Sequence, residues 1–232
     1  MANMAIDRLD GAFVRFGDNA ARGRTVMGVS NIAARRGAKA HRRKAIVAEK
    51  RKTEASEGSQ GGQIVRAMEL PVCCCMLSKE QFEIGMGTLI LARGYAAGPV
   101  AVSPFMLDTF CLGVKDVMFR TIEGEKLEGY LALIGQATPL VAVDPGYARK
   151  LLRDLVQWSA SLGFDPPRAF QSIERLFGSV DPLSCGASFV FGQEGRPFYV
   201  PGPTESPAAV RRRMGQLQQH PGPEGGHYLV SL

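Results

Sequence analysis

Residues 108–116, with the sequence DTFCLGVKD, place two carboxylates, a thiol and an ammonium group within nine positions. If folding brought Asp108 and Asp116 together, the two carboxylates could bind a divalent metal while Lys115 stabilised a developing anion. Cys111 could act as a nucleophile if a base lay beside it. The catalytic hypothesis is therefore a metal-dependent phosphodiesterase or nuclease centred on Asp108, Lys115 and Asp116.

The same residues also fit the end of a buried strand. They follow the apolar run Val100–Leu107, and alternate side chains of an extended chain point to opposite faces, so Asp108 and Cys111 fall on different faces. Gly113 then allows a turn, and Asp, Gly and Lys are common where strands end. We favour this interpretation, in which the polar cluster marks the point where a strand leaves the sheet.

Three adjacent cysteines, Cys73, Cys74 and Cys75, raise the question of a metal site. Zinc sites usually use Cys-x-x-Cys pairs, because the side chains of adjacent strand residues point away from each other. A four-ligand site would have to combine Cys73, Cys75, Cys185 and His227. We expect instead a buried strand in which the thiols pack as small apolar groups. Because no phosphate-binding glycine motif is present either, the sequence predicts neither a metal nor a cofactor.

Charge is distributed unevenly along the 232 residues, whose net charge is +6. Residues 1–52 contain 13 Lys+Arg and 4 Asp+Glu, a net charge of +9, whereas residues 53–232 contain 15 and 18, a net charge of −3. Nine basic residues lie between positions 35 and 52, against the single acid Glu49: Arg35, Arg36, Lys39, Arg42, Arg43, Lys44, Lys50, Arg51 and Lys52. We expect them to contact the phosphates of RNA or DNA, neutralising about 4 to 6 phosphates with a salt slope of about −4 to −5. No aromatic residue lies in this block, so the contacts should be weakly sequence-selective.

Residues 1–62 are predicted to form a basic, disordered arm with a flexible linker, ahead of a single globular α+β domain at 63–232. Large apolar residues are few before position 63, and Ala33–Lys52 has helix propensity without an apolar face to bury. Thr53–Gly62 has the Ser, Gly, Glu and Gln composition of flexible spacers. The basic block could also be a solvated charge run, an organelle-targeting presequence, or translated sequence upstream of the working protein. Acidic residues near the N-terminus weigh against the presequence.

The domain is expected to contain a mixed or antiparallel sheet built from hairpins. Two β-rich runs, Thr88–Arg93 and Val100–Leu107, are separated by a glycine-containing loop and predict one hairpin. Pro104 inside the second run indicates an edge position or a bulge, since proline cannot donate to the ladder. A second hairpin is expected from Ala187–Phe191 and Pro197–Val200, which flank a turn containing two glycines.

Helices are predicted by capping residues that precede apolar positions at helical spacing. The clearest pattern spans Pro145–Leu162, with Asp144 as N-cap and Gly163 at the end. Other helices are expected in three places: a short one starting at a capping box (Ser78 to Gln81), the second member of a helix pair after Pro166, and a C-terminal helix from Pro207 to about Gln219. Residues 226–230 predict a last strand.

The protein is expected to be cytoplasmic. No stretch approaches the roughly 18 to 20 apolar residues needed to cross a bilayer, so no membrane association is predicted. The N-terminal residues mix charged and apolar side chains and lack the core of a signal peptide. Five cysteines, an odd number with three adjacent, suit a reducing compartment better than a disulfide framework.

Three segments resemble segments that occur in the same order in an uncharacterised bacterial protein family: FMLDTFCLGVKD (105–116), SLGFDPP (161–167) and FVFGQEGRPFYVPGP (189–203). The resemblance covers about Phe82–Leu232. It implies one continuous domain and no known activity, so it assigns no catalytic residue.

Taken together, these features predict a nucleic-acid-associated binding or accessory protein rather than an enzyme. The basic arm would contact phosphates, and the acidic domain would engage something else, such as a protein. A third interpretation is a scaffold that recognises a protein partner through its hairpins and the run Arg211–Arg213.

Overall fold

The computed structural model describes residues 58–202 and 204–220 together with the backbone of Leu229 and Val230. All of these residues belong to the second of the two units into which the chain divides, Glu54–Leu232. The basic block, and with it the predicted disordered arm, lies outside the described residues. Each described helix is too short or too polar to cross a membrane.

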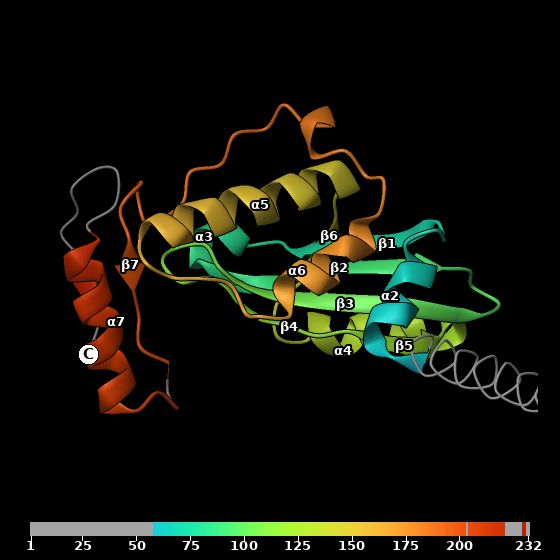
Figure 1. Cartoon of the computed structure of the whole chain (residues 1–232), viewed down its shortest axis with the longest axis horizontal. Helices are drawn as coiled ribbons and strands as arrows, with labels where there is room; N and C mark the ends of the chain where they lie inside the picture. Colours follow the sequence, from blue (N-terminus) through green and yellow to red (C-terminus); the bar gives the residue numbers. More distant parts are fainter. Residues whose placement is uncertain (1–57, 203, 221–228, 231–232) are drawn as a thin grey trace, which may run out of the picture. The chain divides into compact units, whose positions relative to one another are not determined.

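The described residues form an α+β fold, as the sequence predicts (Figure 1). The strands are β1 (Val72–Ser78), β2 (Met86–Gly94), β3 (Pro99–Asp108), β4 (Gly113–Val117), β5 (Arg120–Glu123), β6 (Leu140–Ala142), β7 (Phe198–Tyr199) and β8 (Leu229–Val230). The α-helices are α2 (Gln60–Ala67), α3 (Gln81–Ile84), α4 (Leu127–Gly135), α5 (Pro145–Ser161), α6 (Phe170–Glu174) and α7 (Pro207–Gln219). Short 3-10 helices span Gly124–Lys126, Arg175–Phe177 and Pro182–Ser184.

Six strands make one antiparallel sheet in the order β4-β3-β2-β1-β6, with β5 pairing β3 beside β4. The predicted first hairpin is confirmed, because β2 and β3 pair continuously from Met86 opposite Asp108 to Gly94 opposite Val100. The strands β7 and β8 form a separate parallel pair. The sheet is therefore antiparallel and built largely from neighbouring strands, which matches the predicted architecture.

Pro104 does not lie at an edge or at a bulge, so that prediction is wrong. Strand β3 is flanked by β2 on one side and by β4 and β5 on the other. Pro104 lies between the part of β3 that pairs β4 and the part that pairs β5, and its carbonyl accepts a hydrogen bond from Met118 N at 3.1 Å. The backbone nitrogen of Pro104 therefore faces the connection between β4 and β5. The N–H that proline lacks is not needed there for a hydrogen bond between paired strands.

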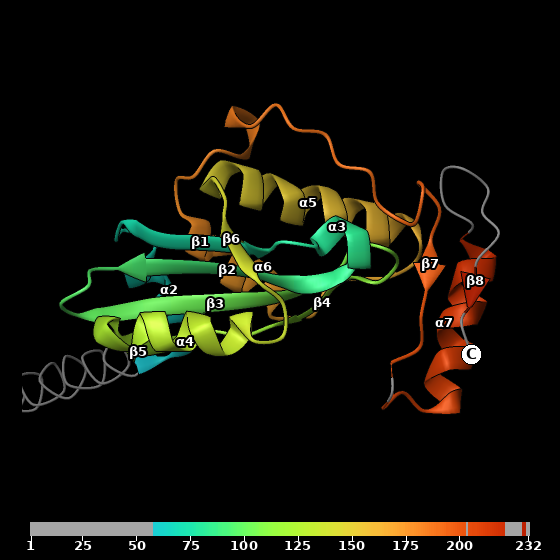
Figure 2. The same cartoon turned by 180° about the vertical axis from the view of Figure 1, so that it is seen from behind.

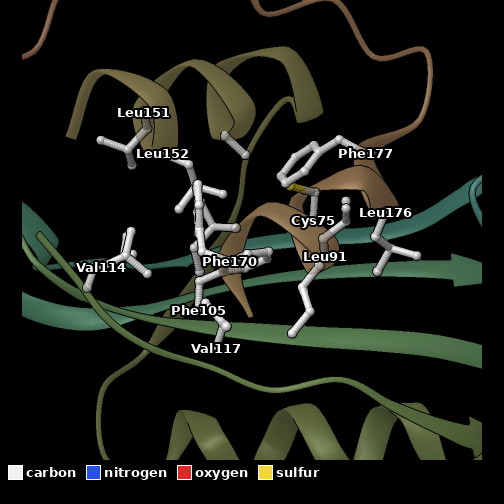
Figure 3. Packing of buried hydrophobic residues seen from close by; sticks show 14 of the residues in the cluster. Cys75, Leu91, Phe105, Val114, Val117, Leu151, Leu152, Phe170, Leu176 and Phe177 are labelled. Atoms are coloured by element: carbon white, nitrogen blue, oxygen red, sulfur yellow. The ribbon is translucent and has the colours of Figure 1, made fainter. Parts of the chain in front are cut away.

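One face of the sheet packs against α2, α5 and α6, and Figure 3 shows this core from close by. The predicted helix Pro145–Leu162 is confirmed as α5, whose N-cap Asp144 accepts hydrogen bonds from the N–H groups of Gly146 and Tyr147. Most of its predicted inward stripe is fully buried: Ala148, Leu151, Leu152, Leu155 and Leu162. Phe105 from β3 meets Phe170 and Phe177 beneath the helix pair.

Salt bridges join helices α5 and α6. Arg149 of α5 donates to Glu174 of α6 at 2.7 Å and to the carbonyls of Gly178 and Val180, and Arg153 donates to the same carboxylate at 3.0 Å. Burial alone would raise the pKa of Glu174, but the two arginines outweigh it and hold that pKa below its ordinary value. The second helix starts at Phe170, later than the proline pair suggests, and continues as a 3-10 turn to Phe177.

The opposite face of the sheet is covered by α4, as the view from behind shows (Figure 2). Apolar side chains of β2 and β3 form a second core with α4: Ile90, Ala92, Val100 and Val102 against Leu127, Tyr130, Leu131 and Ile134. A third core joins the turn after β3 to the end of α5, to β7 and to α7 through Cys111, Leu112, Leu162, Phe164, Tyr199 and Leu217. This third core brings the C-terminal part of the described domain, from the end of α5 to α7, to the 108–116 segment.

Helix starts differ from prediction in two places. Helix α2 begins at Gln60, inside the segment predicted as a linker, because Ser59 caps it and Ile64 and Ala67 are buried against the sheet. The capping box at Ser78 does not form, since Ser78 ends β1 and its hydroxyl accepts from Thr88 N at 2.9 Å. The short helix itself exists as α3, which ends at Ile84 with Gly85 as its C-cap.

The second predicted hairpin is wrong, although its turn is present. Gly192 and Gly195 adopt positive φ, and Gln193 and Arg196 form an isolated bridge. The flanking segments bind the turn after β3 instead of each other: Gly192 N donates to Thr109 O and Phe198 N donates to Phe110 O, both at 2.8 Å. Strand β7 then pairs with β8 in parallel. By contrast, α7 spans Pro207–Gln219 with Ser206 as its N-cap, as predicted.

Candidate functional site

The turn that follows β3 is held rigidly by its own polar residues. The Asp108 carboxylate accepts hydrogen bonds from the N–H groups of Phe110 at 3.1 Å and Cys111 at 2.9 Å. Thr109 is buried, and its hydroxyl lies 3.2 Å from the carbonyl oxygen of Gly85, to which Thr109 N also donates at 2.7 Å. Asp108 therefore organises the turn, which is the structural role favoured for it from the sequence.

Lys115 lies at a β-bulge in β4 and lines a cavity. In the β3–β4 ladder, Leu107 faces Val114 and Met106 faces Asp116, so Lys115 is the extra residue of β4. Val114 and Val117 both enter the core under α5. Lys115 is half-buried and lines the cavity beside the turn. The sequence gives no signal for this bulge, because bulges depend on register with the neighbouring strand.

Three of the four candidate catalytic residues come together, and the fourth does not. Burial raises the pKa of the Asp108 carboxyl, and the hydrogen bonds of the turn and the charge of Lys115 offset this only in part. Burial, and then the nearby Asp108, raise the pKa of the Cys111 thiol, which is the opposite of the lowered pKa that activates a cysteine nucleophile. Asp116 pairs with Met106 on the sheet face opposite to Val114, and its carboxylate accepts from Val117 N at 2.8 Å.

The carboxylates of Asp108 and Asp116 therefore accept hydrogen bonds from different backbone N–H groups near them in the sequence. Among the described residues there is no group of three or more His, Cys, Asp or Glu side chains that could hold a metal ion. The phosphodiesterase hypothesis gains no support from this arrangement.

The cavity beside the turn has a volume of about 300 Å³. It is lined by residues from the turn after β3, from β4, from the turn after α5 and from α7: Leu112, Val114, Lys115, Phe164, Asp165, Pro167 and Arg213. Lys115 and Arg213 both lie close enough to Cys111 for their charges to lower its pKa, against the larger effect of burial. The cavity therefore has apolar walls, two cations and one exposed acid.

Arg213 is the cavity residue that sequence reasoning missed. Its Nη1 lies 3.3 Å from the hydroxyl oxygen of Tyr199 and forms an ion pair with Glu205, whose carboxylate also accepts from Tyr199 OH. Tyr199 is fully buried, whereas Arg211 and Arg212 are exposed. The sequence indicates the run Arg211–Arg213 only as a surface for a protein partner. In α7 the three side chains point in different directions, because consecutive helical positions lie on different faces.

The three adjacent cysteines lie in β1, but the prediction that all three thiols pack in a buried strand is wrong for Cys73. Cys75 is buried in the core under α5, Cys74 packs with the core under α4, and Cys73 is exposed at a register shift in the β1–β2 ladder. Cys185, the fourth residue of the zinc hypothesis, is a half-buried thiol. All five cysteines are free thiols.

Replacing Asp108 with asparagine is expected to stabilise the domain at about pH 7 by on the order of 1 kcal/mol. The amide oxygen can still accept both turn hydrogen bonds. Because the folded pKa of Asp108 is raised, its contribution to stability is full below the unfolded pKa and is lost as pH rises through the folded pKa. Urea denaturation from about pH 3 to pH 7 should therefore show that the gain grows with pH. A variant less stable than the parent at every pH would show that the carboxylate charge is needed.

In comparisons with models of protein families, with curated proteins and with solved structures, nothing matched this chain. The resemblance of residues 82–232 to an uncharacterised bacterial family therefore stays a prediction. The roles given above rest on the geometry of the described residues alone.

Proposed function

We propose that this is a nucleic-acid-associated binding protein whose segment Ala33–Lys52 contacts the phosphates of RNA or DNA. The observation that carries the proposal is the charge of that segment, nine basic residues against one acid. Neutralising phosphates with lysine and arginine releases condensed counterions, which is the main source of nonspecific affinity for nucleic acids. The segment lacks aromatic residues, so we infer contacts to phosphates rather than to bases.

The composition of the rest of the chain supports separate binding roles for the basic segment and the domain. Residues 53–232 carry a net charge of −3, and several of their cations are already paired, such as Arg149 and Arg153 with Glu174 and Arg213 with Glu205. An acidic domain repels a polyanion at long range. We infer that the phosphate affinity lies in the basic segment, and that the domain engages another molecule, such as a protein.

The hydrogen bonds and burial of the candidate catalytic residues favour a binding function over catalysis. Asp108 and Asp116 accept hydrogen bonds from their own backbone, and the Cys111 thiol is fully buried. A cytoplasmic location belongs to the same proposal, and the five free thiols fit a reducing compartment.

The proposal is tested by fluorescence anisotropy with a short labelled RNA, and with a DNA duplex of the same sequence, using the full chain. One variant replaces five arginines of the segment with glutamine: Arg35, Arg36, Arg42, Arg43 and Arg51. We expect its affinity to fall by about 100-fold at about 0.1 M salt, because several phosphate contacts are lost together.

The matched control replaces five exposed arginines of the domain with glutamine: Arg168, Arg175, Arg196, Arg211 and Arg212. It removes the same charge from the chain, and we expect its affinity to change by less than about threefold. Equal losses in the two variants would mean that only net charge matters, and the segment would lose its special role.

A further inference from the structure

The cavity beside the 108–116 turn combines apolar walls with cationic side chains, and the proposed binding of nucleic acid by Ala33–Lys52 assigns no role to it. Its apolar walls come from three parts of the chain: Leu112, Val114, Phe164 and Pro167. Its volume of about 300 Å³ is at the lower end of the range for ligand sites. A ligand there would be a small molecule.

Lys115 is the first of the two cations that line this cavity. The β-bulge places it as the extra residue between Val114 and Asp116, and it is half-buried. In the part of the chain that the structure describes, Lys115 has no hydrogen-bond or ion-pair partner, whereas Lys150 is paired with Asp154. Its ammonium group therefore keeps three donors for a ligand.

Arg213 supplies a second cation, and this one is fixed in place. Its hydrogen bond with Tyr199 and its closest contact with Glu205 are both made through Nη1, and neither Nε nor Nη2 donates a hydrogen bond to a described residue. The buried ring of Tyr199 also lies 5.7 Å from the guanidinium carbon. A guanidinium that is already held can bind an anion with little further loss of side-chain entropy.

The acids around the cavity limit how anionic the ligand can be. Glu205 offsets much of the charge of Arg213, Asp165 is exposed on the cavity lining, and Asp108 lies near Lys115. Because these acids offset part of the cationic charge, we expect a bare anion to compete poorly with water for this site. An anion that also carries an apolar group can gain affinity from the walls and orientation from the cations.

We propose that this cavity binds a small organic anion, with a carboxylate or phosphate group held by Lys115 and Arg213 and an apolar group against Leu112 and Phe164. The inference is independent of the proposed binding of nucleic acid. It adds to the domain a ligand site that the sequence motifs did not indicate.

The test uses protein-observed NMR on the full chain with phenyl phosphate as the probe. Inorganic phosphate supplies the charge without the ring, and benzyl alcohol supplies the ring without the charge. We expect saturable amide shifts at Leu112, Lys115 and Phe164, and phenyl phosphate binding at least about 10-fold tighter than either fragment. Benzoate, titrated in parallel, shows whether a carboxylate or a phosphate is preferred.

The deciding variant is Lys115→Met, with Lys126→Met as the control, since Lys126 is exposed and does not line the cavity. We expect Lys115→Met to weaken phenyl phosphate about 10-fold and Lys126→Met to leave it unchanged. If Lys115→Met unfolds, Lys115→Gln replaces it. Equal affinity in the folded Lys115 variant and the parent, or absence of saturable shifts at the three amides, overturns the proposal.

Discussion

Replacing Arg93 with methionine is expected to lower the free energy of unfolding by about 3–5 kcal/mol. Arg93 is 5 % exposed, and its guanidinium donates to the carbonyls of Met68 at 2.6 Å, Leu70, and Phe177 at 2.7 Å. Met68 and Leu70 follow the C-terminal end of α2, and Phe177 is the last residue of the 3-10 helix after α6. Methionine fills a similar volume but donates nothing, so three carbonyls lose their partner at once.

The matched control is Arg168→Met, which removes the same charge from an exposed position. We expect it to change the free energy of unfolding by less than about 0.5 kcal/mol. Both variants are measured by urea denaturation followed by circular dichroism. A loss below about 1 kcal/mol for Arg93→Met would mean that water replaces the guanidinium at these carbonyls.

Replacing Gly113 with alanine is expected to destabilise the domain by about 3 kcal/mol. Gly113 begins β4 opposite Asp108 and has φ of 73°, a conformation that costs a residue with a side chain. A Cβ there would lie 2.3 Å from Ser159 Oγ and 2.5 Å from Ser159 Cβ of α5. The turn and α5 would have to separate, which opens the third core around Cys111 and Leu162.

Gly129→Ala serves as the control for this substitution. Gly129 lies inside α4, and a Cβ there meets nothing within 4 Å. Because alanine is the better helix former, we expect a gain of up to about 1 kcal/mol. Thermal unfolding of both variants separates the two effects. If Gly113→Ala costs no more than about 0.5 kcal/mol, the close packing of the turn on α5 is not what holds the segment.

The elements that sequence reasoning found are those specified by neighbouring residues. Helices α5 and α7 begin at Pro145 and Pro207, directly after the N-cap residues Asp144 and Ser206, whose side chains cap them. The hairpin β2–β3 is specified by two β-rich runs and a short loop. Each signal lies within the element that it predicts, so no distant contact is needed to recognise it.

What the sequence did not reveal depends on contacts between distant positions. The segments around Gly192 failed to form a hairpin because their N–H groups found the carbonyls of Thr109 and Phe110. The cavity is likewise assembled from the turn after β3, β4, the turn after α5, and α7. Lys115 and Arg213 are far apart in sequence, and only the fold shows that they share a site.

The most direct measurement is the salt dependence of binding to a short DNA duplex by the full chain, compared with the five-arginine variant of the basic segment. If the segment neutralises about 4 to 6 phosphates, a plot of the logarithm of the binding constant against that of salt concentration should have a slope of about −4 to −5. The variant should lose most of that slope, and the five-arginine control of the domain should keep it. A slope near zero for the full chain, or the same slope in all three proteins, would argue against phosphate binding by this segment.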